Sequence, residues 1–286
     1  MKIGFIGIGF VGGTTANVLE KKHEIIRYDI DIKKGFTDPS NLKNAEGVFI
    51  CVPTPMKPSG EIDYSPMHNS LKTLTNVTSK NKEKPLVIIR STAVSGTTDK
   101  LEEEYPFNFV FNPEFLREAH ALEDMLNTDR IVIGANRLED FKKTKKIYEP
   151  LFPEEKVKYI HLSRKEAEMV KYANNVMLTI QVMGANEISG ICNSIDIDYN
   201  KIKEIMLMDE RIGKNIDVPG PDGDYGFGGK CFPKDLRALT YLSREKGYEP
   251  NFLEEVWRSN SKFRKNKDWL NIVGATSENN DFNKKD

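Results

Sequence analysis

The first thirty residues constrain the fold more than any other part of the chain, because they combine an apolar run, a glycine-rich turn and a second apolar run. Lys2–Ile6 is apolar and is followed at once by Gly7–Gly12, whose sequence GIGFVG fits the pattern G-x-G-x-x-G. A helix is predicted to begin in this turn, and Asp29 ends the second apolar run about 20 residues after the first glycine. This order predicts a Rossmann-type, dinucleotide-binding unit.

Each glycine of the turn has its own predicted task. Gly7 permits the tight turn, Gly9 lets the backbone approach a pyrophosphate, and Gly12 allows the helix to pack closely on the strand. Asp29 would accept hydrogen bonds from both ribose hydroxyls and would repel a 2′-phosphate, which favours NAD over NADP. The alternative is a tight turn that binds no ligand. The residues predicted to bind NAD here are Gly7, Gly9, Phe10, Val11, Gly12 and Asp29.

Short apolar runs with little polar alternation recur along residues 1–162, separated by helical or turn-rich stretches. Strands buried on both faces have this composition, and their alternation with helices is typical of a doubly wound α/β fold with a parallel sheet. The predicted strands are Lys2–Ile6, Glu24–Ile30, Gly47–Val52, Leu86–Arg90, Phe107–Phe111, Arg130–Gly134 and Lys156–His161.

After residue 162 the periodicity becomes helical. Arg164–Ile195 contains no proline and predicts one long helix, which Ser163 and Glu166 would begin with a capping box. We therefore predict an NAD-binding Rossmann domain over residues 1–162, an all-α central domain over 163–266, and a short remnant with a polar tail over 267–286. The shorter helices expected in the central domain are Tyr199–Met208, Lys234–Lys246 and Phe252–Asp268.

Composition excludes several classes of protein. The 42 Lys and Arg nearly balance the 43 Asp and Glu, which argues against a dedicated nucleic-acid binder. No apolar run reaches the roughly 20 residues that a membrane helix needs. The three cysteines, Cys51, Cys192 and Cys231, have no metal-binding spacing, and so sparse a count suits a reducing cytosol. We expect a cytoplasmic protein without a metal site.

The most informative stretch for chemistry is residues 226–235, GFGGKCFPKD. Pro233 suits the first turn of a helix, so Cys231 is predicted just outside a helix N-terminus, with Lys230 and Lys234 on either side. The helix dipole and these cations lower the pKa of a thiol and enrich the thiolate. The alternative is that Cys231 is a small buried hydrophobic residue. Asp235, four residues later, would face the same cavity.

This stretch, together with Gly220–Gly223, resembles the active-site loop of the UDP-glucose/GDP-mannose dehydrogenase family of nucleotide-sugar dehydrogenases. Further matches follow in the family's order at Ser91-Thr92, at residues 112–118 (NPEFLRE) and at residues 168–175 (EMVKYANN), so the resemblance extends from Met1 to about Asn260. It implies NAD-dependent oxidation of the C6 alcohol of UDP-glucose to the carboxylate of UDP-glucuronate, in two steps and with four electrons. A cysteine would carry the thiohemiacetal and the thioester. A homodimer is the family's habit.

Residue roles follow partly from spacing and partly from the resemblance. Lys171 and Asn175 are four apart on the predicted long helix, share one face, and can donate hydrogen bonds to a developing oxyanion; the alternative is a solvated lysine and an unrelated asparagine. The resemblance implies that the catalytic residues are Cys231, Lys171, Asn175, Asp235, Glu118 and Thr92, and that the last two also lie near NAD. The implied substrate-binding residues are Glu114, Phe115, Leu116, Arg117, Lys171, Asn175, Tyr225, Phe227, Gly228, Gly229, Lys234 and Asn260. For Glu114 a solvated helix edge is the alternative.

The resemblance is incomplete at the C-terminal end. Members of the family usually carry a further UDP-binding domain of about 100 residues, whereas this sequence stops at Asp286, and Lys267–Ala275 resembles only that domain's first strand. A partner chain completing the site is one hypothesis. Other readings are a dehydrogenase of UDP-N-acetylmannosamine or GDP-mannose, a β-hydroxyacid dehydrogenase that needs no thiol, and a non-catalytic NAD-binding remnant or regulatory partner.

Overall fold

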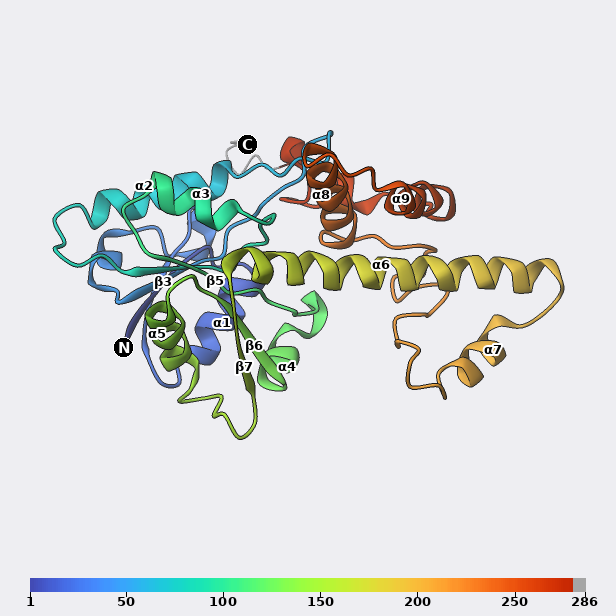
Figure 1. Cartoon of the computed structure of the whole chain (residues 1–286), viewed down its shortest axis with the longest axis horizontal. Helices are drawn as coiled ribbons and strands as arrows, with labels where there is room; N and C mark the ends of the chain where they lie inside the picture. Colours follow the sequence, from blue (N-terminus) through green and yellow to red (C-terminus); the bar gives the residue numbers. More distant parts are fainter. Residues whose placement is uncertain (280–286) are drawn as a thin grey trace. The chain divides into compact units, whose positions relative to one another are not determined.

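The computed structural model describes residues 1–279, which divide into two compact units. The sheet unit comprises Met1–Thr54 and Asp63–Lys171, and the helical unit comprises Pro55–Ile62 and the chain from Tyr172 onward. Helix α6, Arg164–Ser194, is continuous through the division, as Figure 1 shows. The prediction of one long helix from Arg164 is confirmed.

The sheet unit is built on a seven-stranded sheet of order β2-β1-β3-β4-β5-β6-β7. All seven predicted strands form, with ends that differ by a few residues from those expected, and β1 to β5 are parallel. In contrast to the expected parallel sheet, β6 pairs antiparallel with β5, and β7 follows β6 in parallel. The apolar composition of a buried strand does not encode its direction, so the sequence could not reveal this reversal. The strands are β1 Lys2–Ile6, β2 Glu24–Tyr28, β3 Gly47–Ile50, β4 Leu86–Ile89, β5 Phe109–Phe111, β6 Arg130–Gly134 and β7 Lys158–Leu162.

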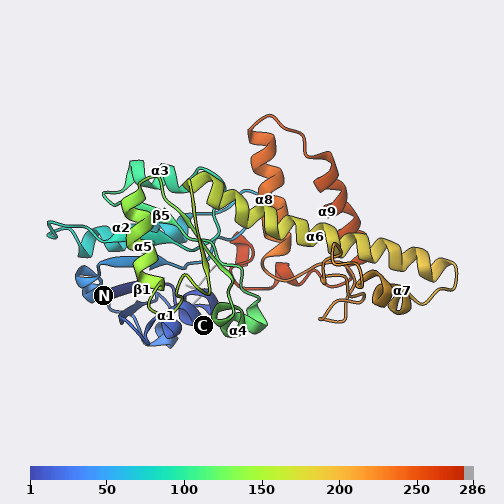
Figure 2. The same cartoon turned by 60° about the horizontal axis from the view of Figure 1, so that its bottom comes forward.

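Helices cover both faces of this sheet, which confirms the doubly wound α/β class. One hydrophobic cluster joins the strands to α1 (Phe10–Leu19), α4 (Ala121–Leu126) and α5 (Leu138–Tyr148). The other joins them to α2 (Ser65–Val77) and α3 (Thr97–Glu104), and these two groups of helices lie on opposite sides of the strands in Figures 1 and 2. The two cores fix the strand ends that carry the predicted nucleotide site.

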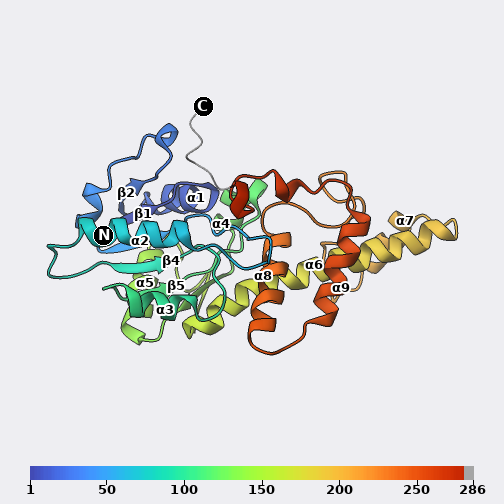
Figure 3. The same ribbon diagram turned by 90° about the horizontal axis from the view of Figure 1, so that it is seen from above.

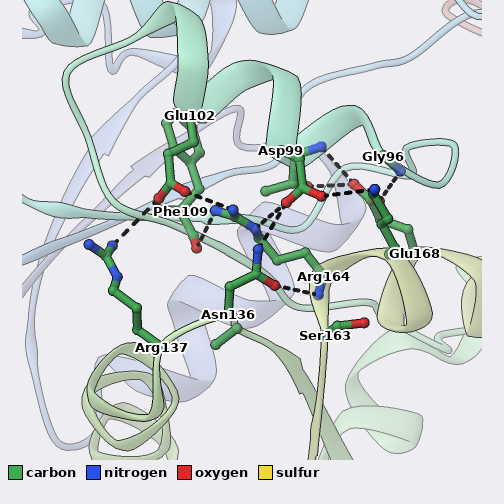
Figure 4. A network of polar contacts seen from close by, with 12 residues as sticks. Gly96, Asp99, Glu102, Phe109, Asn136, Arg137, Ser163, Arg164 and Glu168 are labelled. Atoms are coloured by element: carbon green, nitrogen blue, oxygen red, sulfur yellow. Dashed lines mark hydrogen bonds and ion pairs between the residues drawn. The ribbon is translucent and has the colours of Figure 1, made fainter.

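The start of α6 is fixed to α3 by buried charged groups (Figure 4). Arg164 donates to Asp99 Oδ1 and to Glu102 Oε2, both at 2.7 Å. Glu168, with no exposed surface, accepts from the Gly96 N–H at 2.6 Å, where α3 begins. This attachment sets the rotation of α6 and therefore the direction of the side chains in its next turn.

In the helical unit, α6 packs against two helices that run antiparallel to each other. Helices α8, Phe232–Glu245, and α9, Asn251–Phe263, lie side by side in Figures 2 and 3. Their shared core with α6 contains Val176, Met183 and Leu236. Helix α7 (Tyr199–Met206) follows α6. The three shorter helices predicted in this region form, but α9 ends at Phe263 instead of Asp268.

The prediction for Lys267–Ala275 is wrong, because no strand forms there. The segment contains a short 3₁₀ helix, Asp268–Leu270, and turns; only Thr276 makes an isolated bridge, to Met56. Trp269 is buried against Trp257 and Met56, and this packing holds the segment on its own unit. The predicted polar tail lies partly outside the described residues. Within residues 1–279, no helix has both the length and the apolar character needed to cross a membrane.

Candidate active site

The glycine turn lies at the carboxyl ends of β1 and β3, where the strand order reverses and α/β sheets bind ligands. Gly7 has a φ of 92°, and a Cβ on it would lie 2.6 Å from the carbonyl oxygen of Cys51. A Cβ on Gly12 would lie 2.0 Å from the Gly7 oxygen, so the helix–strand packing requires glycine. A Cβ on Gly9 would meet no atom of residues 1–279 within 4 Å. Gly9 therefore keeps the space that a pyrophosphate needs at the N-terminus of α1.

Asp29 is buried just after β2, and its carboxylate accepts hydrogen bonds from three donors. Its Oδ2 accepts from the Ile8 N–H at 2.6 Å and from Lys34 Nζ at 2.8 Å, and its Oδ1 accepts from the Asp31 N–H at 2.9 Å. Burial alone would raise the pKa of Asp29, but Lys34 and the two N–H groups outweigh it and hold the pKa below its usual value. The carboxylate stays charged beside the turn, as ribose binding requires. Lys34 was not predicted.

Lys171 and Glu114 form a buried ion pair in the sheet unit. Lys171 Nζ donates to Glu114 Oε1 at 2.9 Å, both side chains being about 5% exposed, and the Leu116 N–H donates to Glu114 Oε2 at 2.7 Å. The lysine ammonium also lies 5.8 Å from the centre of the Phe115 ring. The alternative readings, a solvated lysine and a solvated helix edge at Glu114, are wrong, because both groups are buried and residues 112–117 are not helical.

The remaining predicted residues of the sheet unit are more open. Thr92 is half-buried just after β4, and Glu118 is exposed at the start of a 3₁₀ turn, Glu118–His120. Arg117 is exposed and donates to Asp124 Oδ1 at 2.6 Å. An exposed carboxylate such as Glu118 is available to water.

A buried polar network lies beneath this region and was not predicted. Arg90 Nη1 donates to Asn112 Oδ1 at 2.7 Å, and the hydroxyl of Tyr148 donates to the same oxygen at 2.5 Å. A cavity of about 50 Å³ adjoins these residues and Glu114. The network fixes the chain where β5 leads into Glu114.

In the helical unit, the predicted loop leads Cys231 to the N-cap of α8, as expected from Pro233. Asn175 Nδ2 donates to Asp235 Oδ2 at 2.5 Å, and Lys234 is bonded to the other carboxylate oxygen. Lys234 and Asp235 are buried, whereas Cys231 is only partly buried. Within this unit, Asp235 is therefore bonded to Asn175, another residue predicted to be catalytic.

The other two cysteines are poor nucleophile candidates. Desolvation raises the pKa of the Cys51 thiol to about 12. Cys192 is buried in a core cluster with Ala185 and Tyr199. The alternative in which Cys231 is a buried hydrophobic residue is disfavoured by its partial exposure.

Three of the predicted substrate residues of the helical unit have contacts within it: Phe227, Asn260 and Tyr225. The ring of Phe227 packs in the core beside Val176 and Leu236. Asn260, which has no exposed surface, accepts from the Phe227 N–H at 2.7 Å. Tyr225 is half-buried and packs against the cluster around Val218, while Gly228 and Gly229 lie in the loop itself.

The glycine turn, the open space at Gly9 and the charged Asp29 define a dinucleotide-binding unit that fits NAD. Residues 33–152 match the NAD binding domain, and residues 165–262 the central domain, of the UDP-glucose/GDP-mannose dehydrogenase family. The chain belongs to this family, which confirms the resemblance seen in the sequence and NAD as the cofactor.

Individual relatives agree with this assignment. The chain is 32% identical over 299 residues to UDP-glucose 6-dehydrogenase of Rickettsia bellii, which covers 92% of this chain and 67% of that protein. Three further Rickettsia enzymes of that name are matched over about half their length. A UDP-glucose dehydrogenase from Pyrobaculum islandicum aligns with a TM-score of 0.81 at 26% identity, over 91% of this chain and 68% of that one. For GDP-mannose dehydrogenase of Pseudomonas aeruginosa the TM-score is 0.67 at 28% identity, over 92% and 69% of the two chains.

Proposed function

We propose that this chain catalyses the NAD-dependent oxidation of UDP-glucose to UDP-glucuronate. The observation that carries the proposal is the arrangement at the start of α8. The partly buried Cys231 occupies the N-cap position of the helix, and the buried Asp235 is held by Asn175 and Lys234 within the same unit. Relatives named UDP-glucose 6-dehydrogenase support UDP-glucose as the substrate.

In the first oxidation the C6 alcohol loses a proton and a hydride and becomes an aldehyde. NAD, when bound at the glycine turn, accepts the hydride. We assign to Lys171 and Asn175, four residues apart on α6, the donation of hydrogen bonds to the oxygen as it gains negative charge. The ion pair with Glu114 keeps the Lys171 ammonium oriented for this task.

In the second oxidation the thiolate of Cys231 bonds to the aldehyde carbon and gives a thiohemiacetal. Loss of a second hydride to a second NAD leaves a thioester, and water cleaves the carbon–sulfur bond to give the carboxylate and free thiol. Balanced over both steps, one alcohol, one water and two NAD⁺ give one carboxylate, two NADH and three protons. We assign proton handling to Asp235 and positioning of the hydrolytic water to Glu118.

A panel of nucleotide sugars tests the substrate. Purified chain with NAD is given UDP-glucose, UDP-N-acetylmannosamine or GDP-mannose, and NADH formation is followed. The proposal predicts that UDP-glucose gives the highest kcat/KM. Faster turnover of one of the other two sugars would assign the chain to that substrate instead, and turnover that persists in Cys231→Ala would favour a β-hydroxyacid dehydrogenase.

We further propose that the chain forms a homodimer in the cytoplasm. The helical unit exposes apolar side chains along α6 and its continuation into α7, and clusters of this kind mark protein interfaces. The chain has only three cysteines, and so sparse a count suits a reducing compartment. Light scattering of the purified chain tests the dimer, and a mass of one chain at micromolar concentration would contradict it. The exposed residues are Met177, Ile188, Ile191, Ile195, Ile205 and Met208.

A further inference from the structure

The loop that leads to Cys231 is held at its first half by two asparagines. Asn260 Oδ1 accepts from the Phe227 N–H at 2.7 Å, and its Nδ2 donates to the Phe227 oxygen at 3.0 Å. The Gly226 N–H donates to Asn186 Oδ1 at 2.9 Å. These bonds fix the backbone up to Phe227 and leave Gly228–Lys230 to be held by other groups.

The second half of the loop rests on two residues that follow α9. The carboxylate of Asp268 accepts from the Gly229 N–H, at 3.2 Å through Oδ1 and 3.1 Å through Oδ2. The guanidinium of Arg264 lies against Gly228, since a Cβ there would be 2.1 Å from Nη2 and 2.3 Å from Cζ. Real Cβ atoms essentially never approach within 3.0 Å, so the guanidinium itself makes glycine necessary at position 228.

Arg264 is in turn fixed from three directions. Its side chain is 1% exposed, and its Nη2 donates to Asp222 Oδ2 at 2.5 Å and lies 3.2 Å from Asp268 Oδ2. Its Nε donates to the Asn266 oxygen at 2.8 Å. A planar guanidinium bonded on several sides cannot rotate freely, so it forms a rigid support under the loop.

We propose that Arg264 and Asp268 are positioning residues for the thiol of Cys231. Gly229 lies two residues before Cys231, which is the N-cap of α8, so fixing the Gly229 peptide fixes the sulfur at the helix N-terminus. The inference deepens the proposed function, on which it rests for the role of the thiol. It also assigns a role to the segment after α9. From the sequence alone, this segment was predicted to be only a remnant of another domain.

The test is the alkylation of Cys231 by iodoacetamide, followed for each cysteine separately by mass spectrometry across neutral and alkaline pH. In Asp268→Ala the Gly229 N–H loses its acceptor, and we expect Cys231 to react at least about threefold more slowly at neutral pH, with the midpoint of its pH profile moved upward. Asp268→Asn keeps one acceptor oxygen and should restore most of the wild-type profile. Asp209→Asn, which alters an exposed pair with Arg211, is the matched control. An unchanged midpoint in a folded Asp268→Ala variant would overturn the inference, and so would faster alkylation without a shifted midpoint.

A double-mutant cycle provides a second test that does not depend on Asp268. Gly228→Ala should slow alkylation of Cys231 in the wild-type chain, because the new Cβ displaces the guanidinium. In an Arg264→Ala background the same change should have little further effect, and equal effects in both backgrounds would overturn the role of Arg264. NADH formation from UDP-glucose is measured in parallel on the wild-type chain. Shifted alkylation without NADH would retain this inference and refute the proposed function, and the converse result would do the opposite.

Discussion

The ammonium of Lys171 donates to Glu114 Oε1 at 2.9 Å, and neither side chain is more than 6% exposed. A buried lysine is held in its charged state at low cost only when a carboxylate faces it, so this pair links the catalytic proposal to stability. It also joins α6 to the loop that follows β5 within the sheet unit.

Removing the charge of Glu114 should therefore be destabilising. We expect Glu114→Gln to lower the free energy of unfolding by about 2–4 kcal/mol, because it removes the carboxylate charge that faces a buried ammonium. Glu139→Gln, which breaks an exposed pair with Lys143, should have a much smaller effect, because solvent screens that pair. Urea denaturation measures both changes. Equal losses in the two variants would contradict the account of the buried pair.

Glu168 predicts a pH dependence of stability. Burial raises its pKa to about 7 from 4.5, against the opposing hydrogen bonds from Thr98 and Gly96. Because the folded-state pKa lies above the unfolded value, the contribution of Glu168 to stability is full below pH 4.5 and is lost as pH rises through 7. The loss should amount to roughly 3 kcal/mol. Glu168→Gln, which cannot ionise, should flatten the stability curve over this range.

Glu166 provides a control of opposite sign two residues away. Its hydrogen bonds with the Ser163 hydroxyl and N–H lower its pKa, so its contribution is present at neutral pH and is lost as pH falls. Glu166→Gln should therefore change the acid end of the curve and leave the neutral range unchanged. Parallel wild-type and Glu168→Gln curves between pH 4.5 and 7 would refute the assignment to Glu168.

Two glycines of the nucleotide turn should respond differently to alanine. Gly12→Ala places a Cβ 2.0 Å from the Gly7 oxygen, so the backbone must move, at a cost of about 2–3 kcal/mol or more. Gly9→Ala meets no atom within 4 Å among residues 1–279 and should cost less than about 1 kcal/mol. It should nevertheless weaken NAD binding at least about tenfold, because the new methyl group occupies the pyrophosphate space. Thermal denaturation and calorimetric titration with NAD separate the two effects. Unimpaired NAD binding by Gly9→Ala would contradict the placement of the pyrophosphate.

The ion pair between Asp29 and Lys34 leads us to expect that neutralising Asp29 changes the preference between NAD and NADP. Asp29→Asn removes the charge that repels a 2′-phosphate and releases Lys34 to pair with that phosphate. We expect the NAD affinity to fall about tenfold and the preference for NAD over NADP to fall further. Lys34→Gln, in contrast, should keep the preference for NAD. Binding titrations with both nucleotides decide the matter, and an unaltered preference in Asp29→Asn would refute the role of its charge.

The features that could be predicted from the sequence are local ones. The glycine turn, the start of α8 at Cys231 and the long helix α6 each depend on residues close together in the chain, and their patterns were sufficient. The predicted parallel direction of β6 was wrong, because the apolar composition of a buried strand is the same in a parallel and an antiparallel strand. Lys267–Ala275 resembles a strand in its sequence but does not form one. Trp269 packs against residues of the helical unit instead.

The partners of the site residues could not be read from the sequence, because they depend on contacts between distant segments. Glu114 lies 57 positions from Lys171, and Asp268 lies 39 positions from Gly229. Neither spacing follows a helical or strand period, so only the fold brings these groups together. The residues that the sequence missed, Lys34, Arg90, Arg264 and Asp268, all act on a predicted site residue or on the backbone beside one.

The most direct test of the central claim is the number of NADH molecules formed per UDP-glucose consumed, in the wild-type chain and in Cys231→Ser. Cys192→Ala, which changes a core thiol away from the α8 N-terminus, serves as the control. We expect two NADH per UDP-glucose in the wild-type and control chains, and no UDP-glucuronate in Cys231→Ser. One NADH per UDP-glucose in the wild-type chain, or two in Cys231→Ser, would contradict the central claim.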